Sequence, residues 1–187
     1  MNIFVLHRDP TIAAQMHCDK HVPKMCVEAA QMMASALRRH GATDEQMPLT
    51  KAGKPYKGGY AHHPCTVWAG DRRQNFVWLY RYGITLCQEY GKRFGKVHSC
   101  SKPINIMYRL RDIIPSGRPA GFALAMPDEY RPDPDDLYGD ETVYHCGTKE
   151  AVKAYRRYYH SKQFAKWEKG TPAPDWWPSV LLTEERL

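Results

Sequence analysis

The sequence of 187 residues is long enough for one large domain with a substantial buried core. Hydrophobic residues make up 43% and charged residues 25%, a globular composition that excludes a disordered chain. The formal net charge is +7 and no run of 18 apolar residues exists, so we expect a basic protein without a membrane span. The apolar start, residues 1–6, lacks the basic flank and the cleavage site of a signal peptide, and we therefore expect a cytoplasmic protein.

The first elements predicted are a short extended segment and two helices. Residues 2–6 are apolar and are expected to be buried. The Asp9-Pro10 pair is typical of a helix start, because Asp accepts a free amide hydrogen and proline suits the first helical position. Apolar residues then recur at three- and four-residue steps through residues 11–40, and Pro23 is expected to kink or interrupt this stretch. We predict a short helix, then a longer one that begins within residues 19–22.

Residues 43–62 contain glycines, prolines and lysines without periodicity, and this pattern predicts a flexible basic loop. A second helical region begins at His63-Pro64. It is expected to break at Gly70-Asp71, where Asp71 would cap the next helix, and to end by residue 95. Residues 103–114 form a third amphipathic pattern, which the following proline and glycine end.

The last third of the chain begins with a loop-like region that includes an acidic loop at residues 127–141. Residues 148–167 are predicted to form the final helix, and Trp176-Trp177-Pro178 to pack back on the body. Strand signals are scarce throughout. We therefore predict a mostly α fold, a compact helical bundle in which residues 1–187 form a single domain.

The charge is unevenly distributed along the chain. Residues 1–120 carry 18 Lys and Arg against 8 Asp and Glu, whereas residues 121–187 carry nine against 12. Basic excess together with 12% aromatic residues favours a nucleic-acid partner, because cations bind phosphates and rings stack on bases. A solvated basic surface without a partner explains the charge equally well.

The densest group of chemically versatile residues is His17-Cys18-Asp19-Lys20-His21, followed by Lys24 and Glu28. On a continuous helix His17, His21, Lys24 and Glu28 would share one face. A histidine beside an acid and a lysine is a natural acid–base unit, so His21, His17 and Asp19 are our candidate catalytic residues. A structural polar face at a helix junction is the alternative.

A metal site is a further alternative for the two histidines, because their spacing of four residues suits one on a helix. No further ligand motif follows them, and the six cysteines form no C-x-x-C pair. We therefore expect neither a bound metal nor a cofactor.

Candidate contacts to nucleic acid are spread over the chain. Cations, ring nitrogens and one amide that would bind phosphate or substrate are Lys20, Lys24, His63, Arg72, Arg73, Asn75, Arg93, Lys96, His98 and Arg156. Rings that would stack on an unstacked base are Trp68, Tyr155 and Tyr158. For Arg72 and Arg73 a solvated helix start is the alternative, and for the tyrosines it is a buried helix stripe.

Several blocks are similar to a family of small bacteriophage proteins. They are Asn2-Ile3-Phe4-Val5-Leu6, Ala13-Ala14-Gln15, His17-Cys18-Asp19-Lys20-His21, His63-Pro64-Cys65-Thr66-Val67-Trp68, Gly95-Lys96-Val97-His98, Ala125-Met126-Pro127-Asp128-Glu129-Tyr130 and Ala154-Tyr155-Arg156-Arg157-Tyr158-Tyr159. More remotely, that family resembles pyrimidine-dimer DNA glycosylases of the endonuclease V type, which are compact α-helical proteins. It also resembles phage amino acid:DNA transferases of thymine hypermodification, which replace a pyrophosphate on 5-hydroxymethyluracil in DNA by an amino acid.

The resemblance places the glycosylases' Arg-Glu-Leu-Pro block, whose Glu is catalytic, at Lys20-His21-Val22-Pro23. His21 then stands where the Glu belongs. The glycosylases use the amine of a small processed N-terminus as nucleophile, whereas the bulk of Asn2 disfavours removal of Met1. Residues 155–167 resemble the aromatic, basic segment that faces DNA in the glycosylases.

These departures favour a transferase as the first hypothesis. It would act in an infected bacterial cell on a flipped, pyrophosphorylated 5-hydroxymethyluracil in double-stranded DNA, with a free amino acid as second substrate. His21, oriented by Asp19 or His17, would be the general base, and Arg72, Arg73, Arg93 and Lys96 would bind the departing pyrophosphate. The alternatives are a pyrimidine-dimer glycosylase and a non-catalytic DNA-binding module.

A DNA partner predicts a steep salt dependence of binding. Affinity for duplex DNA should fall by roughly tenfold or more for each fourfold rise in salt if even a few phosphates are contacted. Titrations of a labelled duplex at several salt concentrations measure this slope. A flat response would contradict the nucleic-acid interpretation.

Overall fold

The computed structural model describes residues 1–118 and 121–178, and its regular secondary structure is almost entirely helical. The α-helices are α1 (Pro10–Gln15), α2 (His21–Arg39), α3 (Pro64–Asp71), α4 (Arg73–Phe94), α5 (Ser101–Tyr108) and α6 (Thr148–His160). Two-residue strands β1 (Phe122–Ala123) and β2 (His145–Cys146) pair antiparallel, with Phe122 opposite Cys146. Three single-turn 3-10 helices are η1 (Arg111–Ile113), η2 (Asp128–Tyr130) and η3 (Pro134–Asp136). The predicted mostly α fold is confirmed.

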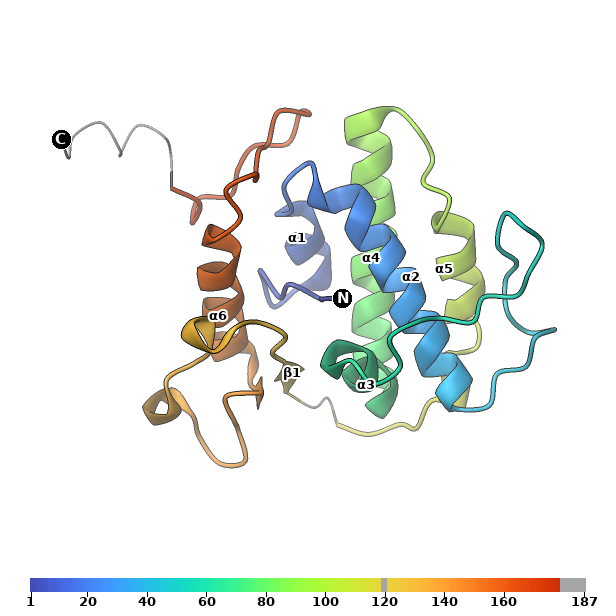
Figure 1. Ribbon diagram of the computed structural model, residues 1–187, viewed down its shortest axis with the longest axis horizontal. Coiled ribbons are helices and arrows are strands. Elements are labelled where there is room, and N and C mark those ends of the chain that lie inside the picture. The colour runs from blue at the N-terminus through green and yellow to red at the C-terminus, as the bar shows by residue number, and fades with distance from the viewer. Residues whose placement is uncertain (119–120, 179–187) are drawn as a thin grey trace.

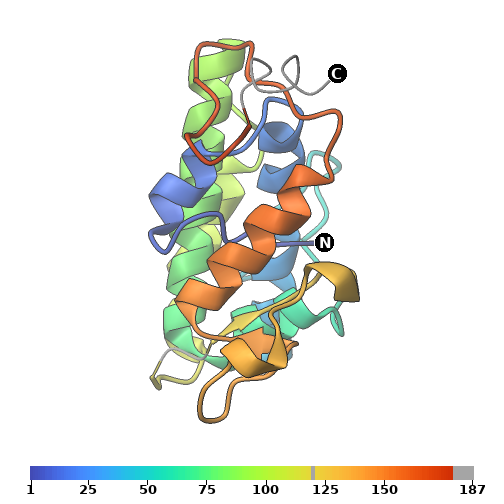
Figure 2. The same ribbon diagram turned by 90° about the vertical axis from the view of Figure 1, so that its left-hand side faces the viewer.

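The helices form two groups with the N-terminal segment between them (Figure 1). In one group α2 packs on α3, α4 and α5, and α1 packs on α4. On the other side α6 lies against the β1–β2 ribbon and crosses the N-terminal segment (Figure 2). Ile3, Val5 and Leu6 are fully buried, so this segment is part of the core, as expected, although it forms no strand.

The start of the chain follows the sequence prediction closely. The Asp9 carboxylate accepts the Thr11 amide hydrogen at 2.8 Å and Pro10 opens α1. The kink expected at Pro23 is wrong. Because α2 begins at His21, Pro23 lies in its first turn, where a backbone amide has no intrahelical acceptor and its absence costs nothing.

Three other boundaries differ from the prediction. Asp71 does not cap α4; it is the last residue of α3 and its carboxylate pairs with Arg39 at 2.6 Å. The third amphipathic stretch is divided into α5 and η1. The final helix ends at His160 rather than at residue 167, and the chain then turns back across the end of the bundle.

The C-terminal residues that the structure describes return to the N-terminal half, as predicted for the tryptophan pair. The indole of Trp167 donates to the Met16 carbonyl at 3.2 Å, and the Trp176 and Trp177 rings pack against Tyr159 and His160. No helix among the described residues is long and apolar enough to cross a membrane.

Candidate functional site

A small cavity of about 190 Å³ opens where the N-terminal segment, α2 and the chain after α6 meet. Typical small-molecule pockets measure roughly 300–1,000 Å³, so this cavity suits a single ring-sized group. The residues that line it are Met1, Asn2, Phe4, His21, Lys24, Glu28, Tyr158, Lys162 and Phe164. An amine, a carboxylate, an imidazole and two lysines therefore share one small space.

The amino end of the chain lies beside the Glu28 carboxylate. The Asn2 amide donates to Glu28 Oε2 at 2.8 Å, and the Met1 α-amine lies 3.8 Å from the same oxygen. Glu28 is almost fully buried, and Lys24 pairs with its other oxygen at 3.6 Å. If Met1 were removed, the Asn2 nitrogen would itself be the α-amine, already within hydrogen-bond distance of Glu28. An amine next to a buried carboxylate is thus built into the fold.

A strained turn sets the path of this segment. Phe4 has φ of 32°, a conformation that residues with a Cβ rarely adopt. The Asn2 side chain stabilises the turn, because its Oδ1 accepts the Ile3 and Phe4 amide hydrogens at 2.8 and 3.0 Å. The Phe4 ring forms one wall of the cavity and stacks on Tyr158. Backbone strain at a cavity wall is typical of functional sites.

A chain of buried hydrogen bonds leads from the cavity into the core. His21 Nδ1 lies 2.8 Å from the Tyr159 hydroxyl, which lies 3.2 Å from His17 Nδ1. His17 Nε2 lies 2.6 Å from the Tyr82 hydroxyl, and the Cys18 amide donates to the Tyr159 oxygen at 3.0 Å. Tyr159 therefore orients His21, and neither Asp19 nor His17 contacts it by a hydrogen bond.

Both histidines are neutral in this environment. Burial lowers the pKa of His17 well below its ordinary value. Burial also lowers the pKa of His21 to about 4, and the positive charges of Lys24, Lys162 and Lys20 act in the same direction. Neutral imidazole carries one ring proton, so each ring donates at one nitrogen and accepts at the other.

Counting protons along the chain assigns the tautomers. Among the described residues the Tyr82 hydroxyl hydrogen has one acceptor within reach, His17 Nε2. His17 then carries its proton on Nδ1 and donates it to Tyr159, whose own hydrogen goes to His21 Nδ1. His21 is left with a proton on Nε2, the nitrogen not used by Tyr159. The opposite polarity would leave the buried Tyr82 hydrogen without an acceptor, at a cost of about 1–3 kcal/mol.

Lysines and rings surround His21 at the cavity. Lys20 and Lys24 are exposed, and Lys162 lies 3.5 Å above the Tyr158 ring. The Phe164 ring, partly exposed, contacts His21 edge-on, with the Lys20 ammonium 4.6 Å from its centroid. Of the stacking and phosphate-binding residues predicted from sequence, Lys20, Lys24 and Tyr158 meet here.

Arg93 and Asp19 belong to a buried structural network instead. The Arg93 guanidinium is fully buried and bonds the Glu89 carboxylate at 2.9 Å and Asp19 at 3.1 Å. It also donates to the carbonyls of Gln15 and His17. The predicted phosphate-binding role of Arg93 is therefore wrong, because its guanidinium is fully buried and all three of its nitrogens donate to protein acceptors. Asp19 contacts Arg93 and the Glu168 amide rather than His21.

Three more candidates are core residues. Trp68 packs against Trp78 and Phe122 and is 2% exposed, and Tyr155 is fully buried with its hydroxyl donating to the Ala123 carbonyl. Neither ring is available to a base, so their predicted stacking role is wrong. Asn75 is buried and donates to the Trp68 carbonyl at 2.9 Å, which excludes a contact with phosphate.

The remaining candidates do not line the cavity, although His63 lies near enough to the Met1 amine and to Glu28 for both charges to act on its ring. His63 caps α3 through the Cys65 amide, Arg72 and Arg73 contact backbone carbonyls near α4, and Arg73 also pairs with Asp112. Lys96 is exposed and His98 is buried among cysteines. Arg156 donates to the Leu6 carbonyl and supports the N-terminal segment.

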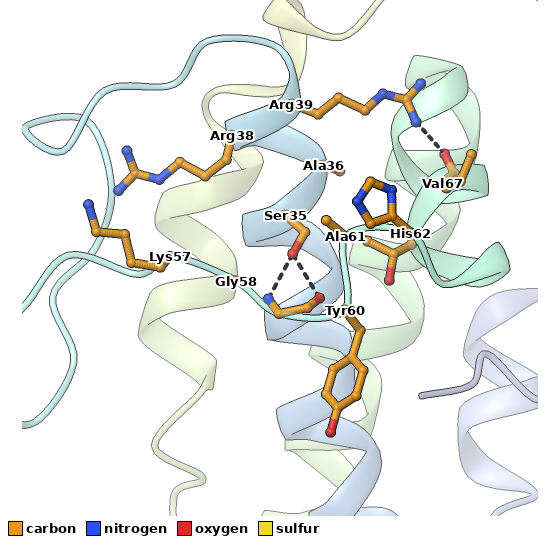
Figure 3. Close-up of a pocket in the computed structure, with 12 residues that line it drawn as sticks. Ser35, Ala36, Arg38, Arg39, Lys57, Gly58, Tyr60, Ala61, His62 and Val67 are labelled. Atoms are coloured by element: carbon orange, nitrogen blue, oxygen red, sulfur yellow. Dashed lines mark hydrogen bonds between the residues drawn. The ribbon is translucent and has the colours of Figure 1, made fainter.

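A larger cavity of about 570 Å³ lies between α2, α3 and the loop of residues 57–62 (Figure 3). Ser35 bonds both backbone groups of Gly59, which attaches this loop to α2. The three cations that line the cavity are all engaged in ion pairs, since Arg38 and Lys57 share Asp44 and Arg39 pairs with Asp71. Its residues bring no nucleophile beside a base, so we do not assign the chemistry to it.

One of the comparisons with known proteins finds a match. A family model described as pyrimidine dimer DNA glycosylase matches residues 1–102, which include the N-terminal segment and α1 to α4. The chain belongs to this family. No curated protein and no solved structure matches it significantly. The matched region of this glycosylase family member includes the cavity residues Asn2, His21 and Glu28. It does not include the cavity residues Tyr158, Lys162 and Phe164.

Burial of neutral imidazoles predicts a pH-dependent stability. The unfolded pKa of His21 is about 6.5 and the folded one about 4, so the unfolded state binds the proton first as the pH falls. The free energy of unfolding should decrease below pH 6.5, by roughly 2–3 kcal/mol from His21 at pH 4.5. Urea denaturation at pH 7 and 4.5 should show this loss reduced in His21→Gln and unchanged in the exposed variant His62→Gln. Equal losses in all three proteins would contradict it.

The proton count predicts the tautomer of each ring. At pH 7 the imidazole of His17 should carry its proton on Nδ1 and that of His21 on Nε2. Two-bond nitrogen–proton NMR spectra distinguish the two forms, with His17→Gln and His21→Gln providing the assignment. A His21 ring protonated on Nδ1 would contradict the assigned polarity.

Proposed function

We propose that the protein is a DNA glycosylase that removes a damaged pyrimidine by attack of its terminal amine. The observation that carries the proposal is the amine of residues 1–2 beside the buried Glu28 carboxylate, in a cavity sized for one ring. A nucleophile needs an adjacent base to activate it, and a carboxylate within reach of the amine is suited to that task. Membership of the pyrimidine dimer DNA glycosylase family supports the same chemistry.

In this proposal Glu28 performs the proton transfer that the catalytic Glu performs in related glycosylases. His21 stands where those enzymes carry their Glu. Glu28 lies almost two helical turns after His21 in α2. Both residues line the same cavity. The Glu28 carboxylate, almost two turns further along α2, can therefore replace the missing one.

The bond changes then follow from the groups present. The amine nitrogen forms a bond to C1′ of the nucleotide while the glycosidic bond breaks, and its proton passes to the Glu28 carboxylate. The pyrimidine leaves with the electron pair of the broken bond. The Nε2–H of His21 is suited to donate a hydrogen bond to the carbonyl oxygen of the pyrimidine on which that negative charge develops. His21 thus acts in this scheme as a donor, and the base is Glu28.

The surroundings suit a flipped nucleotide in DNA. Lys20, Lys24 and Lys162 surround the opening with positive charge, which attracts phosphates on either side of the extruded base. Tyr158 and Phe164 offer apolar rings at the entrance, and stacking on such rings offsets part of the unstacking cost. The predicted duplex DNA partner therefore remains part of the proposal.

Amino acid transfer to 5-hydroxymethyluracil, the first hypothesis from sequence, has weaker support. It requires a base and a free amino acid in the site together, and the cavity has room for one ring-sized group. Of the four cations expected to bind pyrophosphate, Arg93 is enclosed in its network and Arg73 is paired with Asp112. The other two, Arg72 and Lys96, are exposed but do not line the cavity. We retain transfer as a distinguishable outcome of the test.

The test uses Glu28→Gln, which keeps the acceptor for the Asn2 amide and removes the charge. On ultraviolet-irradiated duplex DNA the parent should excise bases, and the variant should be slower by about 10²–10⁴-fold in single turnovers with nearly unchanged DNA affinity. The exposed variant Glu45→Gln is the matched control and should behave as the parent does.

Mass spectrometry of the product nucleosides distinguishes the alternatives. Full excision by Glu28→Gln would contradict the role of Glu28. A parent protein that leaves irradiated DNA intact but attaches an amino acid to pyrophosphorylated 5-hydroxymethyluracil would replace the glycosylase proposal by the transferase.

A further inference from the structure

Three potential metal ligands meet on the far side of α2 from the N-terminal cavity. Cys26 in α2, Cys87 in α4 and His98 before α5 bring one ligand atom each within 4.8 Å of the other two. All three side chains are buried, and all six cysteines of the chain are free thiols. Nothing in the proposed glycosylase chemistry uses them.

The spacing of these atoms is close to that of a tetrahedral zinc site. With Zn–S bonds of about 2.3 Å and Zn–N bonds of about 2.0 Å, ligand atoms lie roughly 3.3–3.8 Å apart. Atoms within 4.8 Å of one another need to move by about 1 Å to reach that geometry. Thiolate and imidazole ligands are the set that zinc prefers.

Cys100 is the candidate for a fourth ligand, and its thiol lies outside the group of three whose ligand atoms are all within 4.8 Å of one another. It is buried at the start of α5, and its amide donates to His98 Nδ1 at 3.1 Å. Its thiol and that of Cys87 both interact with the His98 ring. Three thiols and one imidazole therefore gather in the same part of the core.

We propose that Cys26, Cys87, His98 and Cys100 form a structural zinc site that joins α2, α4 and the start of α5. Four protein ligands leave no open position, and the burial of the cluster keeps substrates away, so the site is structural rather than catalytic. Uptake of one Zn²⁺ releases the thiol protons of the three cysteines. The occupied site carries a net charge of −1 when its imidazole is neutral.

Metal binding has a consequence for the His98–Cys100 turn. Nδ1 of His98 accepts the Cys100 amide hydrogen, so Nε2 is the nitrogen free for zinc. Ligation at Nε2 leaves the ring proton on Nδ1, which breaks this hydrogen bond. We therefore expect the turn to shift when the metal binds.

The proposed site differs from our expectation of no metal. That expectation considered His17 and His21, and the structure engages both in the tyrosine hydrogen-bond chain. The zinc ligands lie on three separate segments of the chain, with His98 and Cys100 the one pair close in sequence. A spacing motif therefore could not reveal them.

The experiment uses the full chain, stripped of metal under reducing conditions. Addition of one equivalent of Zn²⁺ should raise the thermal midpoint by about 10 °C. Addition of Co²⁺ should give the intense thiolate-to-cobalt absorption and the visible bands of a tetrahedral site. A stripped protein that shows neither response, with its thiols confirmed as reduced, would overturn the proposal without requiring any variant.

Variants then test the ligand set. Cys87→Ser and Cys100→Ser should each lose stoichiometric zinc, as measured by elemental analysis after dialysis. Cys146→Ser, which changes a buried cysteine outside the cluster, should keep one zinc per chain. Retention of zinc by Cys87→Ser would overturn the site, and retention by Cys100→Ser would overturn the assignment of the fourth ligand. DNA excision by the parent is a separate readout, so failure of the zinc proposal leaves the glycosylase proposal standing.

Discussion

Burial of the N-terminal segment is the constraint on which the rest of the structure depends. Residues 3–6 run through the core between α2 and α6, so the amino end of the chain emerges beside Glu28 and nowhere else. The Asn2 side chain holds the amino end in this position. Its oxygen accepts the amide hydrogens of Ile3 and Phe4, and its nitrogen donates to the Ala125 carbonyl. A free chain end would sample many positions; this one is held next to a carboxylate.

Helix α6 completes the site by the same packing. Tyr159 reaches across to His17, Cys18 and His21, so one hydroxyl connects the two groups of helices. The cavity is lined by Tyr158, which precedes Tyr159 in α6, and by Lys162, which follows the end of the helix. The hydrogen-bond chain is buried, and it determines which ring nitrogen of His21 carries the proton. The chain begins at Tyr82, whose side chain does not line the cavity. Stability and chemistry therefore share the same side chains.

Local patterns predicted most of the fold. Asp9-Pro10, the three- and four-residue apolar steps and the glycine at residue 95 identify helix ends that the structure confirms. Pro23 was misjudged because its effect depends on where the helix begins. Of the candidate site residues predicted from sequence, three line the cavity, namely His21, Lys24 and Tyr158.

The missing parts of the site arise from contacts between distant residues. The sequence places Glu28 on the same helix face as His21. Its role in the site depends on its contact with the Asn2 amide, 26 residues earlier in the chain. Tyr159 and Phe164 reach the cavity only because the chain after α6 folds back. Rings and cations of the kind that bind DNA are buried at Trp68, Tyr155 and Arg93. Their burial results from tertiary packing, which composition does not reveal.

The most direct measurement is reductive trapping of the reaction on damaged DNA. Opening of the sugar ring, which breaks the C1′–O4′ bond, converts the amine adduct at C1′ to an imine. Borohydride reduces this imine to a stable bond, and peptide mass spectrometry then locates the attached residue. The account predicts a trapped complex joined through the α-amine at Met1, or at Asn2 in chains that have lost Met1. Base excision with DNA joined to Lys24 or Lys162, or with no trapped complex at all, would contradict it.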